Sequence, residues 1–223
     1  MHNLTLIIPA KHEAESLPIV LDELQKYNYN INIILHPTDV NTIKAIKNYN
    51  INIIYQKNKG YGDALIQGIN SCKTKYFCIF NADGSFDPSE IEKMYNTINS
   101  EKLDFIFASR YQSKSGSEDD TIITLIGNYI FTYIGKIFFK LNITDILYTF
   151  VIGKTKEALM LNLTKKNFSF CVELPIKAKK MKMKLGSTNS YERKRIAGKK
   201  KVNAFRDGFL ILKYMIKLFF MKS

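Results

Sequence analysis

The first 111 residues alternate short apolar runs with amphipathic segments, and this alternation strongly limits the folds available to the chain. The runs span residues 4–9, 30–35, 51–56, 76–80 and 104–111. The first is continuously apolar apart from Thr5, as expected for a strand buried on both faces. Between the runs, apolar residues recur at helical spacing, as Leu17, Val20, Leu21 and Leu24 do. Strands that alternate with helices predict an α/β fold with a largely parallel central sheet flanked by helices.

The pattern changes after Arg110. Residues 112–121 are polar and predict a mobile loop. Two aromatic-rich stretches, 121–141 and 204–221, have the character of helices, with mixed structure between them. Lys136 and Asn128 interrupt the first of these, so no run of 18 uncharged apolar residues exists and we do not expect a membrane-spanning helix.

The composition indicates a single well-buried domain, and its charge favours an anionic partner. A chain of 223 residues that is 46% hydrophobic is long enough for one core and short for two. The net charge of +13 predicts a nucleic acid, a phosphate-bearing ligand or an anionic membrane surface as partner, unless it reflects a general bias toward lysine. No nucleic-acid-binding motif is found, so we do not expect nucleic acid.

The cysteines and the N-terminus indicate a reducing compartment. Cys72, Cys78 and Cys171 show no C-x-x-C spacing, so neither a disulfide framework nor a zinc site is expected. The chain enters its first apolar run without the features of a signal peptide. We expect a cytoplasmic protein that is peripheral on the inner face of the membrane.

The stretch "NADGSFD" (81–87) follows an apolar run and places Asp83 and Asp87 at its tip. Such a strand end is where α/β enzymes hold ligands. Mg²⁺ favours one or two carboxylates together with substrate phosphate oxygens. The same residues also suit a turn and a helix cap, with Pro88 in the first turn.

Two further stretches suit an anionic ligand without specifying one. "NKGYGDAL" (58–65) offers backbone amides at a helix start through Gly60 and Gly62, although it is neither a dinucleotide-binding nor a P-loop motif. Glu13 and Glu15 follow the first strand and serve either as ligands or as helix N-terminal acids.

Taken in order, these motifs resemble a known family. "LIIPAKHEAESL", "NKGYGDALIQGI", "FNADGSFDPSEI", "DFIFASRY" and "RIAGKKKVNAFRDG" occur in the sequence and spacing of the family 2 glycosyltransferases of the GT-A fold. The chain is most similar to their dolichyl- and polyprenyl-phosphate sugar transferases. The resemblance covers nearly all of residues 1–223 and implies a single glycosyltransferase domain. Residues 1–111 are then the nucleotide-sugar-binding half of a Rossmann-like fold, and residues 112–223 the acceptor-side half.

The resemblance also implies roles for individual residues. Asp83, with Asn81 and Ser85, is expected to bind Mg²⁺ or Mn²⁺ on the donor diphosphate. Arg110, Arg195 and Lys201 are expected to act with Asp83 in catalysis by meeting phosphate. The nucleotide-sugar site is expected to comprise Pro9, Ala10, Glu13, Gly60, Gly62, Asn81, Ala82 and Asp83.

The chain departs from the family pattern at three places. Asn81 replaces the first acid of the D-x-D motif. Its side chain brings no charge, so we expect the metal affinity to be lower by about tenfold. "LHPTD" (35–39) replaces a V-D-D-x-S segment, where Asp39 is a candidate substitute for the acid that reads the base. Lys200 and Lys201 replace the Ser-Lys of the closing segment.

The C-terminal helix predicts a membrane contact. In a helix over 204–221, Arg206, Lys213 and Lys217 fall within about 40° of one another. Apolar side chains occupy the other faces, as in a helix that lies in a membrane interface. A helix packed on its own core and an oligomer interface are the alternatives, and the oligomeric state is left open.

These observations favour an inverting glycosyltransferase that moves a sugar from a nucleoside diphosphate sugar to a polyprenyl phosphate. A phosphate acceptor is already an oxyanion near neutral pH and needs no dedicated base. One alternative is transfer to a sugar hydroxyl, with Asp87, Asp119, Asp120 or Asp145 as the base. Another is a catalytically weak homologue that binds nucleotide or lipid phosphate.

Overall fold

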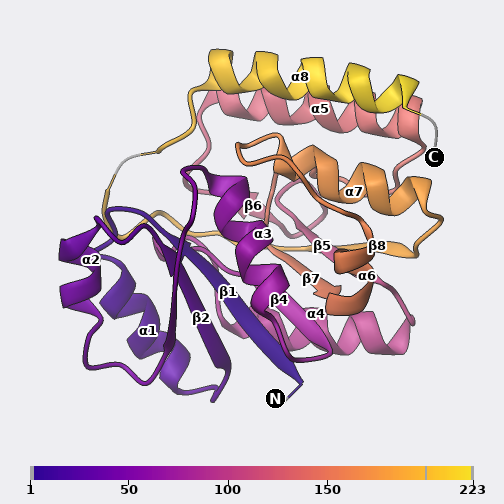
Figure 1. Ribbon diagram of the computed structural model, residues 1–223. Coiled ribbons are helices and arrows are strands. Elements are labelled where there is room, and N and C mark those ends of the chain that lie inside the picture. The colour runs from indigo at the N-terminus through magenta and orange to yellow at the C-terminus, as the bar shows by residue number, and fades with distance from the viewer. Residues whose placement is uncertain (1–2, 199, 222–223) are drawn as a thin grey trace.

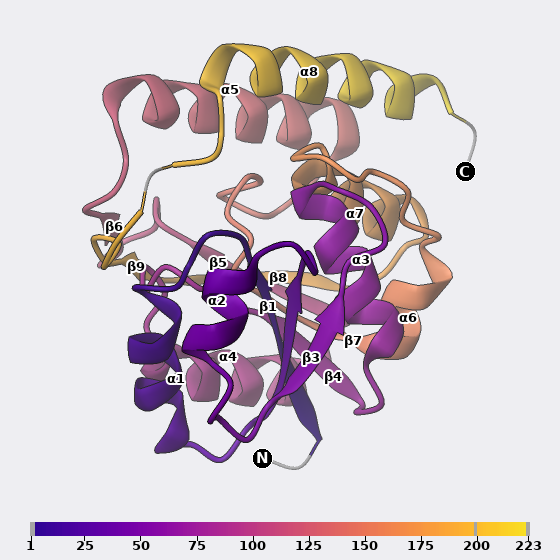
Figure 2. The ribbon, with the colours of Figure 1, turned by 60° about the vertical axis from the view of Figure 1, so that its left-hand side comes forward.

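The computed structural model describes residues 3–198 and 200–221 and has a central sheet with helices on both faces (Figures 1 and 2). Within the described residues the sheet has seven strands in the order β3-β2-β1-β4-β7-β5-β8. Their bounds are β1 Leu4–Ala10, β2 Asn30–Leu35, β3 Asn52–Tyr55, β4 Tyr76–Ile79, β5 Phe105–Ser109, β7 Val151–Lys154 and β8 Leu185–Asn189. All pair in parallel except β7, which is antiparallel to both β4 and β5. The predicted α/β class and largely parallel sheet are confirmed.

The helices cover the two faces of the sheet and add an outer layer to one of them. On one face lie α1 (Leu17–Gln25), α2 (Val40–Ala45) and α4 (Ser89–Ser100). The other face carries α3 (Tyr61–Ser71), α6 (Thr155–Met160) and α7 (Phe170–Lys180). Outside α7, α5 (Ile122–Phe139) and α8 (Ala204–Phe220) lie side by side at the top of the molecule (Figure 1).

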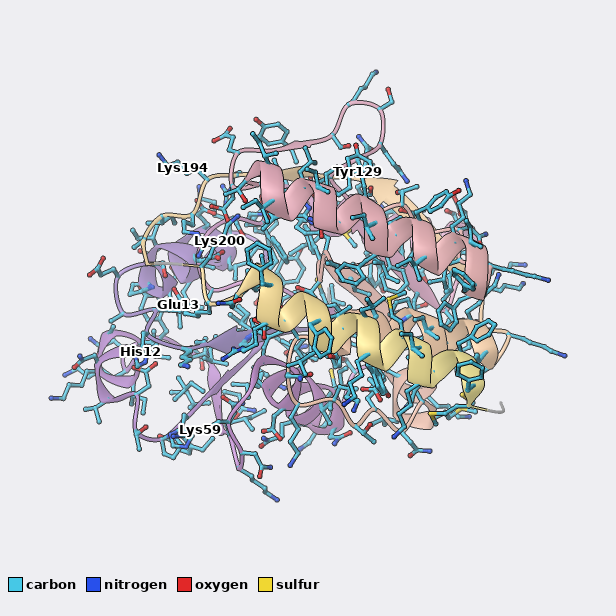
Figure 3. All side chains as sticks on the ribbon, turned by 90° about the horizontal axis from the view of Figure 1, so that it is seen from above. His12, Glu13, Lys59, Tyr129, Lys194 and Lys200 are labelled. Atoms are coloured by element: carbon cyan, nitrogen blue, oxygen red, sulfur yellow. The ribbon has the colours of Figure 1, made fainter. Side chains whose placement is uncertain are left out.

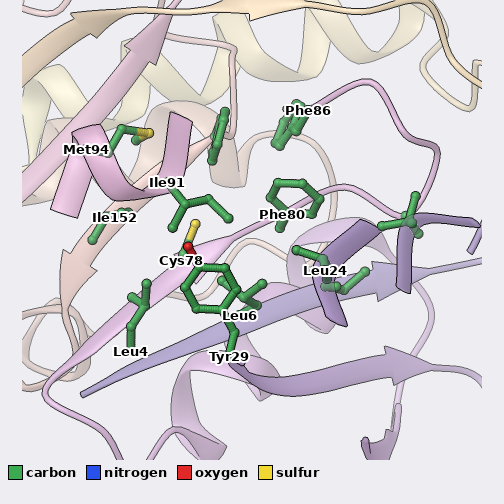
Figure 4. Packing of buried hydrophobic residues seen from close by; sticks show 14 of the residues in the cluster. Leu4, Leu6, Leu24, Tyr29, Cys78, Phe80, Phe86, Ile91, Met94 and Ile152 are labelled. Carbon is green, nitrogen blue, oxygen red and sulfur yellow. The ribbon is translucent and has the colours of Figure 1, made fainter. Parts of the chain in front are cut away.

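Strands buried on both faces explain the continuous apolar runs of the sequence. Successive residues of β1 point to opposite faces, so Leu4, Leu6 and Ile8 join one core cluster while Ile7 joins the other. Figure 4 shows the first cluster, in which Leu6 of β1 packs near Cys78 of β4 and Leu24 of α1. Each apolar run therefore contributes to two cores at once.

The second half of the chain differs from expectation. Residues 112–121 were predicted to form a mobile polar loop, but they include β6 (Gly116–Ser117), which pairs with β9 (Tyr191–Glu192). The amide of Glu118 donates to the carbonyl of Glu192. Two of its acids are held by arginines, Asp119 by Arg195 and Asp120 by Arg110, so part of its polarity reflects ion pairs.

A buried ion cluster around Arg110 joins four segments of the chain. Arg110 follows β5 directly, is 8% exposed, and donates through Nε to Asp145 Oδ2 at 2.8 Å and through Nη2 to Asp145 Oδ1 at 3.1 Å. Its Nη1 donates to Asp120 at 3.3 Å and to Glu192 of β9 at 3.1 Å. The guanidinium also lies 4.5 Å from the ring centre of Tyr148. One cation thus fixes the end of β5, the chain before β7, the lead-in to α5, and β9.

A second buried carboxylate, Glu173 of α7, sets the position of the loop before that helix. It accepts hydrogen bonds from the amides of Thr164, at 3.0 Å, and Lys165, at 2.7 Å, and from the hydroxyl of Tyr214 in α8, at 2.7 Å. Lys177 pairs with it at 2.8 Å. Burial alone would raise the pKa of Glu173, but these hydrogen bonds outweigh burial and lower it. The residue therefore holds α7, α8 and the loop together as an anion.

Replacing Arg110 by methionine is expected to lower the free energy of unfolding by about 3–5 kcal/mol, because it leaves Asp145 and Glu192 as buried carboxylates without their cation. Urea unfolding followed by circular dichroism measures the change. Arg206→Met is the matched control, because Arg206 is 73% exposed and its ion pair with Asp207 is worth at most about 1 kcal/mol. Equal losses in the two variants would contradict a stabilising role for the Arg110 cluster.

Replacing Glu173 by glutamine is expected to cost about 1–3 kcal/mol at neutral pH, because the donors then lose a charged acceptor. The lowered pKa of Glu173 means that its stabilisation is present above its ordinary pKa and is lost as the pH falls through the folded-state pKa. The difference in unfolding free energy between wild type and Glu173→Gln is therefore expected to shrink from about pH 7 to about pH 3. A difference independent of pH would show that the charge of Glu173 is not what stabilises this junction.

Candidate active site

The predicted site lies at the carboxyl ends of β1 and β4, where the strand order reverses. β2 and β3 lie on one side of β1, and β4 lies on the other. Such a switch point is the usual ligand position in an open parallel sheet. Pro9 and Ala10 end β1, and Asn81 to Asp83 follow β4, so the two predicted segments meet at one edge.

Asp83, Asn81 and Ser85 form one oxygen-rich turn. The Oδ1 atom of Asp83 accepts from the amide of Ser85 at 3.1 Å and from its hydroxyl at 2.7 Å. Asn81 Nδ2 donates to the same hydroxyl at 3.4 Å. Within the described part of the chain, no group of three or more His, Cys, Asp or Glu side chains could hold a metal. One carboxylate with neutral oxygen donors fits Mg²⁺ or Mn²⁺ when phosphate oxygens supply the remaining ligands.

The segment that follows β9 lies along this turn. The amide of Ile196 donates to the carbonyl of Asp83 at 2.8 Å, and the amide of Arg193 donates to the carbonyl of Ser85 at 2.9 Å. Gly84 between them has φ +82°, and a Cβ there would lie 2.4 Å from Ile196 Cδ1. The backbone conformation therefore favours glycine at 84, and a larger residue there would also have to displace the side chain of Ile196.

Cations of this segment pair with the acids of the site. Arg195 contacts Asp83 at 3.4 Å and Asp119 at 2.7 Å, and Lys200 also contacts Asp119. Lys201 pairs with Glu13, which is 6% exposed. Figure 3 shows Glu13 and Lys200 close to the start of α8. The structure thus brings Glu13, Asp83, Arg195 and Lys201 together, with each charge neutralised by another, and their roles toward a ligand stay predictions.

Asp119 is the site residue that the sequence did not single out for this position. It was only one of four candidate bases. Burial raises its pKa, but hydrogen bonding and charge from Arg195 and Lys200 dominate, so the pKa is lowered. Of the other candidates, Asp120 and Asp145 lie in the Arg110 cluster, and Asp87 accepts from the amide of Ser89 at the start of α4.

Arg110 is placed differently from the expected phosphate contact. Its Nε, Nη1 and Nη2 atoms all donate to carboxylates of Asp120, Asp145 and Glu192. The phosphate contact stays a prediction. In this structure Arg110 is a positioning residue. It binds Asp120 and so fixes the chain at Asp119, the adjacent residue, which lies in the site.

Gly60 and Gly62 are explained by the loop at Lys165 and Lys166, whose backbone packs closely against them. A Cβ at Gly60 would lie 2.0 Å from the carbonyl oxygen of Lys166, and one at Gly62 would lie 2.0 Å from that of Lys165. The amide of Asp63, in the first turn of α3, donates to the carbonyl oxygen of Lys166 at 3.1 Å. Part of the helix start that was predicted to bind phosphate is therefore occupied by the loop that Glu173 positions.

Asp39 also has a local role. It is the N-cap of α2, accepts from the amide of Thr42 at 3.4 Å and from that of His12 at 2.6 Å, and is 6% exposed. Burial opposes its charge, but the bond from His12 and those from Thr42 lower its pKa. It fixes the turn that carries Glu13, and the predicted contact with a base stays a prediction.

Comparison with solved structures shows the fold. Glucosyl-3-phosphoglycerate synthase from Mycobacterium tuberculosis, in complex with Mn²⁺, UDP and glucosyl-3-phosphoglycerate, superposes with a TM-score of 0.75 at 8% identity, over 100% of this chain and 81% of that one. Mannosyl-3-phosphoglycerate synthase from Rubrobacter xylanophilus gives 0.73 at 9% identity, over 97% and 73%. The α/β fold with its mostly parallel sheet is that of the GT-A glycosyltransferases.

Sequence comparison identifies the family. The chain is 27% identical over 206 residues to the UDP-N-acetylglucosamine–dolichyl-phosphate N-acetylglucosaminyltransferase of Methanococcus voltae, covering 81% of this chain and 82% of that enzyme. It is 25% identical over 145 residues to an uncharacterised protein of Methanocaldococcus jannaschii, covering 63% and 60%. The family model described as glycosyl transferase family 2 matches residues 5–158, more than half of the chain. This chain is therefore a glycosyltransferase and belongs to glycosyl transferase family 2.

Proposed function

We propose that this glycosyltransferase moves a sugar, with inversion, from a nucleoside diphosphate sugar to a polyprenyl phosphate at the cytoplasmic face of the membrane. The observation that carries the proposal is the cationic segment 193–201, of which the described residues 193–198, 200 and 201 lie over Asp83 at the carboxyl edge of the sheet. The relative from Methanococcus voltae, named for a dolichyl-phosphate acceptor, supports the choice of acceptor.

The donor diphosphate is proposed to bind at the turn of Asn81, Asp83 and Ser85. These three side chains would hold Mg²⁺ or Mn²⁺, which neutralises diphosphate charge when bound. Complexes of a structural neighbour with Mn²⁺ and UDP support this cofactor class. Arg195 and Lys201 lie close enough to the turn to stabilise the charge that develops on the leaving diphosphate.

Donor binding must exchange the partners of these cations. Arg195 is bound to Asp83 and Asp119, and Lys201 to Glu13. A diphosphate that enters beside Asp83 offers Arg195 oxygens of the same kind as those of Asp119. The segment 193–201 therefore has an anionic partner both without the donor and with it.

Transfer to a sugar hydroxyl is the second candidate, because Asp119 lies in the site and is a carboxylate that could accept a proton. Its hydrogen bonds from Arg195 lower its pKa and make it a weak base. A phosphate acceptor needs no such base, so the geometry favours the polyprenyl phosphate. A catalytically weak binding homologue is the third candidate, and Asn81 is the observation that supports it.

The function is tested by measuring release of UDP or GDP from a panel of nucleotide sugars with Mn²⁺ and three acceptors: a short-chain polyprenyl phosphate, 3-phosphoglycerate and a free oligosaccharide. Turnover dependent on the polyprenyl phosphate is the expected result. Turnover only with one of the other two acceptors would overturn the lipid assignment. Donor binding without turnover on any of them would favour the binding homologue.

Replacing Asp83 by alanine is expected to lower kcat by about 10²–10³-fold or more, because the turn then has no carboxylate for the metal. Asp87→Ala is the matched control, since it removes an acid of the same loop whose carboxylate accepts from the amide and hydroxyl of Ser89 at the start of α4. Thermal unfolding with and without Mn²⁺ and donor separates loss of binding from loss of fold. Equal activity in the two variants would remove Asp83 from the metal site.

Replacing Asn81 by aspartate is expected to lower the Mn²⁺ concentration for half-maximal activity by about tenfold, because it adds a second carboxylate beside Asp83. A Mn²⁺ titration of nucleotide release measures the change. An unchanged or higher requirement would show that residue 81 does not face the metal.

A further inference from the structure

The outer layer formed by α5 and α8 exposes an unusually large apolar surface. We call this surface the two-helix face. Ile122 and Phe205, at the starts of the helices, are 76% and 78% exposed. The other large apolar side chains exposed on the two helices are Ile123, Ile126, Tyr129, Ile130, Tyr133, Ile137, Phe138, Phe209, Leu210, Leu212, Ile216, Phe219 and Phe220. Contiguous apolar surface of this extent marks an interaction site.

The exposed stripe on each helix points away from the core. On α8, Ile211, Met215 and Leu218 are buried. At about 100° per residue, Phe209 and Ile216 fall about 100–180° from these side chains. On α5, Asn128, Gly135 and Phe139 are buried, and Ile126, Ile130 and Ile137 fall on the opposite side in the same projection. Figure 3 shows both helices from the side of this face, next to one another in a single layer.

Cations lie along the outer edges of the face. Phe138 of α5 contacts Phe219 of α8 with ring centres 5.7 Å apart, which defines the seam between the helices. In helical projection Lys136 lies about 160° from Phe138, and Lys213 about 120° from Phe219. The cations therefore lie away from the seam, with the apolar stripes between them.

The face also lacks exposed acid. The described residues of α5 contain no Asp or Glu, and the one acid of α8, Asp207, is 3% exposed. All exposed charges on the two helices are positive: Lys136, Arg206, Lys213 and Lys217. An apolar centre with a cationic rim matches the chemistry of a bilayer that carries anionic lipid.

We propose that the two-helix face lies flat on an anionic lipid bilayer, with the apolar stripes of α5 and α8 inserted at the interface. A second copy of this chain fits less well, because a two-fold contact through this face would bring cationic rims together without an acid to pair with them. The proposal extends the membrane contact predicted for residues 204–221 to a surface built equally from α5.

α5 lies along the membrane in this proposal and does not cross it. Ile122–Phe139 is the one described helix that is long and apolar enough to span a bilayer by length and composition. We expected no spanning helix because charged and polar residues interrupt this stretch. The structure gives a stronger reason. The helix begins next to Asp120, which Arg110 binds, and ends before Leu141, Ile143 and Asp145, which are buried in the same domain.

The face borders the candidate active site. Asn203, the N-cap of α8, comes two residues after Lys201, and Thr121, the N-cap of α5, comes two residues after Asp119. Lys200 pairs with Asp119 and so joins the two lead-in segments. If the proposed function holds, a lipid phosphate at the level of the bilayer surface reaches Arg195 and Lys201 from this edge.

The proposal is tested by co-sedimentation of the full chain with vesicles of phosphatidylcholine, alone or with about one third phosphatidylglycerol. Strong binding to the anionic vesicles and weak binding to the neutral ones is expected. Ile130→Ser with Phe209→Ser, one exposed residue from each helix, is expected to weaken binding by about tenfold or more. Ile19→Ser with Val40→Ser is the matched control, because these residues are 45% and 49% exposed outside the face.

Charge and self-association are separated by two further measurements. Lys213→Gln with Lys217→Gln is expected to weaken binding to the anionic vesicles by about thirtyfold and to leave binding to neutral ones unchanged. Sedimentation velocity without lipid is expected to show a monomer. A dimer that the Ile130→Ser/Phe209→Ser variant abolishes, without vesicle binding by wild type, would overturn the proposal in favour of a second copy.

Vesicle binding needs neither donor nor acceptor, so its outcome is independent of the proposed function. A chain that binds the anionic vesicles but does not glycosylate polyprenyl phosphate would retain the membrane face and lose the acceptor assignment. A chain that glycosylates a water-soluble short-chain polyprenyl phosphate but does not bind vesicles would retain the acceptor assignment and lose the membrane face. Failure of the Ile130→Ser/Phe209→Ser variant to differ from its control would also overturn the proposal.

Discussion

The buried guanidinium of Arg110 is the interaction on which the second half of the structure depends. It follows the last strand of the alternating β and α region and binds carboxylates at positions 120, 145 and 192. A buried charge is costly unless it is paired and fully hydrogen-bonded, so the three acids and the arginine must be placed together. This requirement brings the lead-in to α5, the chain before β7, and β9 to the carboxyl edge of the sheet, where the segment 193–201 can then reach Asp83.

The candidate site is held by charges that are complementary within the protein. Asp83, Asp119 and Glu13 are each paired with a cation from the segment 193–201. Pairs of this kind, with side chains between 7% and 36% exposed, are close enough to the surface for a phosphate ligand to replace one partner. Asn81 makes the site less acidic than one with two carboxylates. With only one carboxylate to hold a metal, Arg195 and Lys201 would balance a larger part of the charge of a bound nucleotide than they would beside two carboxylates.

The site and the two-helix face are linked by short structured connections. At one end, Asp119 precedes α5, Lys200 precedes α8, and the two side chains form an ion pair. Deeper in the molecule, Tyr214 of α8 donates to Glu173, which also holds the loop that packs on Gly60 and Gly62. An outer helix layer with few buried residues of its own therefore shares hydrogen bonds with both sides of the site. These connections explain how helices with such exposed apolar faces keep a defined position on the fold.

The sequence by itself determined the elements whose residues lie close together in the chain. The apolar runs of β1, β2 and β4 and the helical spacing of α1 predicted the parallel sheet, because a strand or helix is specified by a local period. The motif order predicted the family, and the turn at Asn81 to Ser85 followed from a strand tip and its acids. The cationic stripe of α8 was also visible in the spacing of Arg206, Lys213 and Lys217.

The tertiary structure alone decided the features made by residues far apart in the chain. The insertion of β7 between β4 and β5 could not be predicted, because a short apolar segment does not specify which strands it will pair with. The place of Asp119 in the site and of Arg110 in an ion cluster could not be predicted, because Arg195 is 76 positions from Asp119, and Asp145 and Glu192 are 35 and 82 positions from Arg110. Gly60 and Gly62 looked like a phosphate loop and proved to face the carbonyls of Lys165 and Lys166. Local patterns specify helices and strands. Which residue pairs with a buried charge, and which backbone packs against a glycine, is fixed only when the chain has folded.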